Sequence, residues 1–187
     1  MAIFSSKKSA PATPLAQLRD DPKLSPADQQ RLVREVLSDE TIRAKDVAWS
    51  LAAQRPELRR MGLQVLKRSG GELSKTLIAE FRDKSEGQQK NLIQSACELD
   101  QDTVTAVLTW LQSGDNRRSR SLLGYLIRNA PFEKIKGALS KLAADATGEV
   151  RVAAIARLRE DPAMLRSIGL GADAIAIGTG SMIALNC

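Results

Sequence analysis

Five segments of the sequence begin at nearly equal intervals of about thirty residues and share one local pattern, which constrains the fold more than any single residue. Eight positions after each start comes an aliphatic residue, and three positions further comes a second apolar residue. A spacing of three places both side chains on one face of a helix. A repeat of this length is typical of a stacked array, whose units cannot bury their apolar faces alone. The five starts, each with its two apolar positions, are Ser25-Pro26 (Val33, Val36), Arg55-Pro56 (Leu63, Leu66), Ser85-Glu86 (Ile93, Ala96), Asp115-Asn116 (Leu123, Leu126) and Thr147-Gly148 (Ile155, Leu158).

Residues suited to helix starts occupy these positions. Pro26 and Pro56 stand where the first helical residue is expected, and there the missing N–H of proline costs nothing. Ser85 with Gln88 has the spacing of a capping box, and Asp115 is expected to cap the next helix through its carboxylate. The helix starts therefore agree with the repeat.

Helix ends agree with it too, because Gly70 and Gly114 follow apolar periodic stretches and can end a helix in the left-handed conformation. The connecting turns are short, so consecutive helices are expected to lie antiparallel. We therefore predict an all-α fold, a right-handed α-solenoid of antiparallel helix pairs over residues 15–167, with a flexible lead-in at 1–14 and a short non-repeat tail at 168–187. The predicted helices cover residues 26–38, 41–54, 56–68, 72–83, 86–99, 102–112, 116–129, 132–144 and 148–160.

The stretch from Phe132 to Glu160 shows the repeat unit most completely. One amphipathic helix is followed by the turn 144–147, and Val150-Arg151-Val152-Ala153-Ala154 stands near the start of the second helix. This unit resembles the HEAT family, whose repeats carry an Asp-containing turn followed by Val-Arg-x-Ala-Ala. The resemblance covers residues 26–160 and implies a scaffold whose second helices line a concave, partner-binding face.

Composition argues against several classes of function. Hydrophobic residues make up 43% of the chain and aromatic residues 3%, which suits a helical core of Leu, Ile, Val and Ala. The sequence has no histidine, which excludes histidine-dependent catalysis, and Cys97 and Cys187 give neither a disulfide framework nor a CxxC motif. Cys97 lies among apolar residues and is expected to be a buried, inert thiol. No nucleophile and base pair occurs, so the array is expected to hold no catalytic residue, metal or cofactor.

No segment approaches the roughly 20 apolar residues that span a bilayer. The cysteine usage fits a reducing compartment, so we expect a soluble, cytoplasmic protein that does not enter a membrane.

Cations are concentrated in the first turns of the helices that open the five segments. Helices stacked in register would align them as a ladder able to hold an acidic partner, although solvated faces of amphipathic helices would carry the same charge. Cations near a helix N-terminus oppose the helix dipole, at a cost of a few tenths of a kcal/mol. This cost favours a role for them in binding over a structural role as helix caps. The candidate partner-binding residues are Arg59, Arg60, Lys90, Arg117, Arg118, Arg120 and Arg151.

The predicted function is thus a non-enzymatic scaffold that binds a macromolecular partner, above all a protein, through its concave face. Nucleic-acid binding through the basic ladder is an alternative that a pI of about 9.6 permits. HEAT-like arrays include base-excision enzymes that need aromatic side chains beside a carboxylate in the concave face. Here Trp49, Trp110 and Tyr125 belong to different units and are expected to be core or ridge residues.

The tail has a different composition, with Asp173 as its only charge from Ser167 to Cys187. A short apolar run leads through Gly178-Thr179-Gly180 into the opening of a helix, an order that can cradle a phosphate. The stretches Leu170–Thr179 and Ile183–Cys187 resemble the end of the flavin barrel in the glutamate synthase family. That resemblance implies that Gly178, Thr179 and Gly180 match the FMN-phosphate turn and Cys187 the first ligand of an iron–sulfur cluster.

A flavin barrel of this kind needs about 200 residues or more, and the matched part of the tail has about twenty. We therefore expect no assembled flavin site in this chain. A truncated or fused fragment of an FMN-dependent oxidoreductase is the enzyme alternative, and a fortuitous similarity is the other explanation.

Overall fold

The structure, a computed structural model, describes residues 13–69, 73–114 and 116–160, and over these ranges it contains helices and no strand. The prediction of an all-α fold is confirmed for this part of the chain. The chain divides between Gly71 and Glu72 into two compact units, which we call unit 1 and unit 2. The proposed lead-in lies almost entirely, and the 168–187 tail entirely, outside the described residues.

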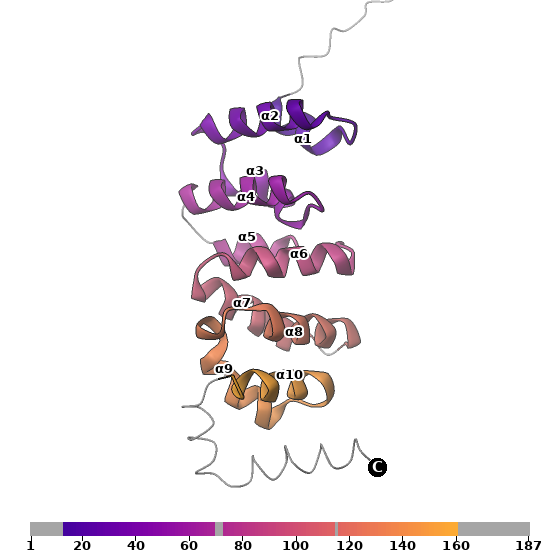
Figure 1. Ribbon diagram of the computed structural model, residues 1–187, viewed down its shortest axis with the longest axis vertical. Coiled ribbons are helices and arrows are strands. Elements are labelled where there is room, and N and C mark those ends of the chain that lie inside the picture. The colour runs from indigo at the N-terminus through magenta and orange to yellow at the C-terminus, as the bar shows by residue number, and fades with distance from the viewer. Residues whose placement is uncertain (1–12, 70–72, 115, 161–187) are drawn as a thin grey trace, which may run out of the picture. The chain divides into compact units, whose positions relative to one another are not determined.

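Unit 1 consists of α1 (Pro14–Asp20), α2 (Pro26–Ser38), α3 (Ala44–Val47), the short 3-10 helix η1 (Ala48–Ala52) and α4 (Pro56–Ser69) (Figure 1). Helix α2 packs against α1 and α4, and α4 also packs against α3 and η1. The interior is aliphatic, as the composition predicts, with Leu32, Val36, Leu51 and Leu66 all buried.

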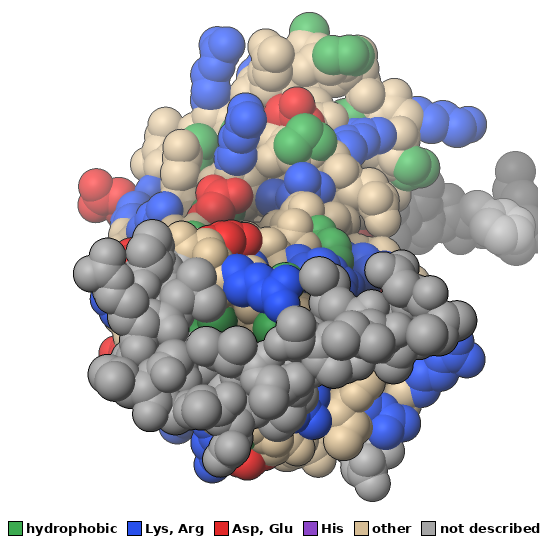
Figure 2. Space-filling view, turned by 60° about the horizontal axis from the view of Figure 1, so that its bottom comes forward, with side chains coloured by type: hydrophobic (Ala, Val, Ile, Leu, Met, Phe, Trp, Pro, Cys, Tyr) green, Lys and Arg blue, Asp and Glu red, His purple; other side chains and the backbone are tan. Residues whose placement is uncertain are grey.

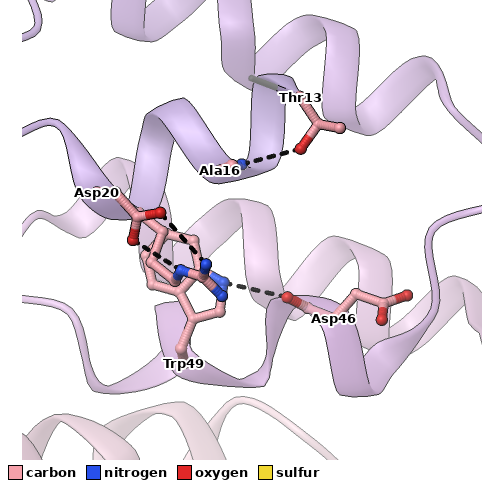
Figure 3. Close-up of polar contacts among 6 residues, drawn as sticks. Thr13, Ala16, Asp20, Asp46 and Trp49 are labelled. Carbon is pink, nitrogen blue, oxygen red and sulfur yellow. Dashed lines mark hydrogen bonds and ion pairs between the residues drawn. The ribbon is translucent and has the colours of Figure 1, made fainter. Parts of the chain in front are cut away.

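Two parts of unit 1 differ from the sequence prediction. Helix α1 was not predicted, although Thr13 accepts a hydrogen bond from the Ala16 N–H at 3.3 Å and Pro14 takes the first helical position (Figure 3). The predicted helix over 41–54 is instead the short α3 followed by η1. In η1 the side chain of Ser50 donates to the carbonyl oxygen of Val47 at 2.7 Å, a bond between residues three apart.

Unit 2 consists of α5 (Leu73–Ala79), α6 (Glu86–Cys97), α7 (Gln101–Gln112), α8 (Arg117–Asn129), α9 (Phe132–Asp145) and α10 (Gly148–Leu158) (Figure 1). The odd-numbered helices contact one another in the order α5, α7, α9, and the even-numbered helices contact one another in the order α6, α8, α10. The five repeated segments of the sequence begin at the even-numbered helices of both units. The second apolar position is buried in every repeat, while Val33 and Ile155 at the first position are half-buried.

The helix starts in unit 2 confirm one predicted cap and correct another. Ser85 accepts from the Gln88 N–H at 3.3 Å, and the Gln88 side chain accepts from the Ser85 N–H at 3.0 Å, which completes the capping box. The prediction that Asp115 caps α8 is wrong, because Asn116 holds the N-cap position and accepts from the Ser119 N–H at 2.8 Å. The capping side chain is therefore that of Asn116, the residue after Asp115.

The prediction that Gly114 adopts a left-handed conformation is also wrong. The C-cap of α7 is Ser113, with a φ of −71°, and among the described glycines only Gly148 has a positive φ. Glycine is required at position 114 for a different reason, since a Cβ there would lie 2.3 Å from the Ser119 hydroxyl oxygen. Gly70 falls outside the described residues.

Candidate partner-binding surface

The Arg118 guanidinium is used to join two helices within unit 2. Its Nε donates to the side-chain oxygen of Gln89 at 2.8 Å, and its Nη2 donates to the carbonyl oxygen of Lys84. Gln89 is buried and donates in turn to the Phe81 carbonyl oxygen at 2.8 Å. The contact therefore ties the start of α8 to the start of α6.

The Arg59 guanidinium also makes internal hydrogen bonds, in unit 1. Its Nη1 donates to the carbonyl oxygens of Ala53 at 2.8 Å and Gln54 at 3.0 Å, where the chain leaves η1. Arg60, the next residue, is exposed, and its side chain makes no hydrogen bond or ion pair with the residues that the structure describes.

The Lys90 ammonium interacts with two neighbouring side chains. Its ammonium lies 2.7 Å from a carboxylate oxygen of Glu86, one turn earlier on α6, and 5.7 Å from the centre of the Tyr125 ring on α8. The hydrogen bond from Lys90 lowers the pKa of the Glu86 carboxyl. The pair is solvent-exposed, so it contributes little to stability, but it leaves Lys90 less available to a partner.

The remaining predicted residues lie in α8 and α10. Arg117 and Arg120 are exposed, and their side chains form no hydrogen bond or ion pair within the described ranges. Arg151 is half-buried, and its enclosed Nε has no hydrogen-bond partner. Unit 2 therefore offers Arg117 and Arg120 on the surface, whereas Arg118 and Lys90 are already paired.

A cavity of about 380 Å³ opens beside Arg120 in unit 2. Leu123, Leu142 and Val150 line its apolar part, and Lys141 at the end of α9 brings a second cation to it. Lys141 was not among the predicted residues, because only the starts of the even-numbered helices were considered. The turn between α9 and α10 is so short that the end of α9 reaches the same place, and reading both sides of each turn would have found this lysine.

Acidic groups accompany the cations on the described surface. Figure 2 shows Lys and Arg side chains on the visible face with Asp and Glu side chains among them.

No group of three or more Cys, Asp or Glu side chains within the described ranges is arranged to hold a metal ion. No helix in those ranges is both long enough and apolar enough to cross a membrane.

The aromatic side chains that a nucleic-acid enzyme could use are engaged in internal contacts. Trp110 packs on Phe81 with ring centres 4.9 Å apart, and the Trp49 Nε1 donates to the Asp46 carbonyl oxygen at 3.1 Å (Figure 3). The Tyr125 hydroxyl accepts from Gln94 at 2.8 Å. All three predicted ridge or core rings are half-buried.

Cys97 is half-buried rather than fully buried, and burial raises the pKa of its thiol to about 11. The thiolate is the reactive form of cysteine, so this environment agrees with the expected inert thiol.

The residues matched to a flavin phosphate turn, Gly178, Thr179 and Gly180, lie outside the described residues, as does Cys187. Comparison of the sequence with protein-family models and with curated proteins, and of the structure with solved structures, found no match.

Proposed function

We propose that this chain is a non-enzymatic scaffold that binds a protein partner. In this proposal the helices form a right-handed α-solenoid of antiparallel pairs, and the second helix of each pair contributes to the concave, partner-binding face. The contacts inside each unit support it: α2 packs on α4 in unit 1, and α6, α8 and α10 follow one another in unit 2.

The observation that carries the proposal is the pair of exposed arginines at the start of α8. Arg117 and Arg120 have no acceptor among the described residues, and α8 has no acidic residue in its first turn. Cations at this end of a helix are unfavourable by a few tenths of a kcal/mol. An acidic surface of another protein would offset that cost and supply the missing acceptors.

A protein partner explains the surface better than nucleic acid does. A nucleic-acid backbone is held by many phosphate contacts, whereas two of the predicted cations, Arg118 and Lys90, already have internal partners. Bases stack on exposed rings, whereas Trp110 and Trp49 are half-buried and engaged.

The test begins with affinity purification of the full chain from a nuclease-treated extract and identification of a retained protein. Calorimetry with that purified protein would then compare the wild-type chain with the double variant Arg117→Ala/Arg120→Ala. The double variant is expected to bind about tenfold more weakly or worse, since two charge-assisted contacts are lost.

Arg34→Ala is the matched control, because Arg34 is an exposed arginine of unit 1 whose side chain makes no hydrogen bond or ion pair with the described residues. Its affinity should stay within about twofold of the wild type. Equal losses in both variants would contradict the proposal. Retention that nuclease abolishes, with an affinity that falls steeply with salt, would support nucleic-acid binding instead. A flavin absorbance spectrum in the purified chain would support the oxidoreductase alternative.

A further inference from the structure

The cavity in unit 2 combines an apolar floor with a rim that carries two cations and a carboxylate among the described residues. Leu123, Leu142 and Val150 are each at most 5% exposed, so they belong to the packed interior and only a small part of each side chain forms the floor of the cavity. Arg120 from α8 and Lys141 from α9 stand on the rim, and both are exposed. The cavity lies where the α7–α8 and α9–α10 turns approach each other.

Three polar side chains of the rim have no internal partner among the described residues. The side chains of Arg120, Lys141 and Thr147 make no hydrogen bond or ion pair in the part of the chain that is described. Asp145 also lines the cavity, but it forms no ion pair with Lys141, which lies four residues earlier on α9. A lysine that precedes its acidic partner by four residues is the weaker orientation of such a pair. Two cations and one carboxylate therefore line the cavity among the residues that the structure describes.

We propose that this cavity binds an acidic segment of the protein partner, with a Glu or Asp carboxylate between Arg120 and Lys141 and aliphatic groups on the apolar floor. The guanidinium can donate two parallel hydrogen bonds to a carboxylate, and the lysine adds a mobile point charge. A volume of about 380 Å³ is at the small end of the range for ligand pockets and suits a few side chains rather than a folded element.

The same surroundings disfavour a nucleic-acid strand. Asp145 lines the cavity, so a strand with successive phosphates would meet a carboxylate as well as the two cations. Among the described residues that line the cavity, none is aromatic and able to stack against a base. An isolated carboxylate beside apolar side chains matches the arrangement better, because it needs only one site of positive charge.

This inference rests on the proposed scaffold function and specifies one contact site for its partner. The direct test uses fluorescence anisotropy of the full chain with a labelled short peptide of Glu and Leu, and with the same peptide in which every Glu is Gln. The Glu peptide is expected to bind about tenfold more tightly than the Gln peptide, and Lys141→Ala should remove most of that difference.

A charge reversal keeps the test independent of simple loss of folding. The double variant Arg120→Glu/Lys141→Glu should lose the Glu peptide and gain affinity for the matching Lys and Leu peptide, while Arg34→Ala should bind the Glu peptide as the wild type does. Equal binding of the Glu and Gln peptides, or tighter binding of a single-stranded oligonucleotide than of the Glu peptide, would overturn the inference.

Lys141 also separates this inference from the broader proposal. If the purified partner protein loses affinity for Arg117→Ala but binds Lys141→Ala normally, the scaffold function stands and the cavity assignment fails. If neither substitution affects the partner, both fail. A loss with Lys141→Ala supports the cavity as part of the partner site.

Discussion

The Nε of Arg118 donates to the buried side-chain oxygen of Gln89 at 2.8 Å and so connects α8 to α6 across one repeat. Unit 1 contains the same arrangement, in which Arg55 donates to the side-chain oxygen of the buried Gln29 at 2.8 Å. In both cases a second nitrogen of the arginine reaches a backbone carbonyl just before the glutamine's helix. Each glutamine stands four positions after its segment start, whereas Arg55 is the first residue of its segment and Arg118 stands three positions after Asp115. The acceptor therefore follows the sequence repeat and the donor does not.

Arg118→Ala should destabilise the chain by about 1–2 kcal/mol, because it leaves a buried amide oxygen without a donor. Chemical denaturation followed by circular dichroism would measure the change. Arg117→Ala is the matched control and should alter the free energy of unfolding by no more than about 0.5 kcal/mol, since Arg117 has no internal contact among the described residues. Similar effects of the two substitutions would show that the Arg118 contact contributes nothing measurable.

The sequence was sufficient to predict elements whose ends carry local signals. Ser25-Pro26 correctly marks α2, predicted at 26–38, and the Ser85 and Gln88 capping box marks α6. Helix α1 carries a similar signal in Thr13-Pro14, but the surrounding Ser, Ala and Pro residues masked it. The predicted 41–54 helix is instead α3 followed by η1, and both pack against α4, a tertiary contact that local sequence does not encode.

The sequence predicted where the cations of the candidate surface lie, but not which of them have internal partners. The repeat placed cations at the helix starts, but which of them are free depends on the distance to the neighbouring helix. The Arg118 guanidinium donates to Gln89 inside unit 2, whereas Arg120 lines a cavity. A difference of two positions on one helix decides between a structural and an exposed role, and it follows from tertiary contacts.

Gly62→Ala should destabilise unit 1 by about 1–3 kcal/mol through overpacking. A Cβ at position 62 on α4 would lie 2.2 Å from the Ser50 hydroxyl oxygen and 3.1 Å from Leu51 Cδ2. Ser50 is fully buried and its hydroxyl is held by the Val47 carbonyl oxygen, so it has little room to move. Thermal denaturation of the purified variant would measure the loss.

Gly137→Ala is the natural control for that substitution. Gly137 lies inside α9, and a Cβ there would meet nothing within 4 Å. Alanine should therefore stabilise the chain by about 0.5–1 kcal/mol through helix propensity and reduced freedom of the unfolded chain. A stabilising effect at both positions would mean that η1 can move away from α4.

Asp100 should make stability depend on pH in the acidic range. It caps α7 by accepting from the Thr103 N–H at 2.7 Å and from the Thr103 hydroxyl at 3.1 Å, and the backbone hydrogen bond is the main cause that lowers the pKa of its carboxyl. A lowered pKa in the folded state means that the stabilisation is complete above the unfolded pKa of about 4 and is lost as the pH falls through the folded value.

The check compares the free energy of unfolding of the wild type with that of Asp100→Asn from neutral pH to about pH 2. Asparagine can still cap the helix but does not titrate, so the advantage of the wild type should shrink below about pH 4. An advantage that grows on acidification would reverse the assigned sign and refute the role of the carboxylate.

Cys97 should react slowly with thiol reagents while the chain is folded. With a thiol pKa of about 11, only about one thiol in a thousand is ionised at pH 8, whereas an unperturbed cysteine of pKa about 8.5 is ionised in roughly a quarter of molecules. In a Cys187→Ser variant, which leaves Cys97 as the sole thiol, labelling by iodoacetamide at pH 8 should be about a hundredfold slower in the folded chain than in denaturant. Equal rates in the two states would mean that burial does not protect this thiol and that the α6 end opens readily.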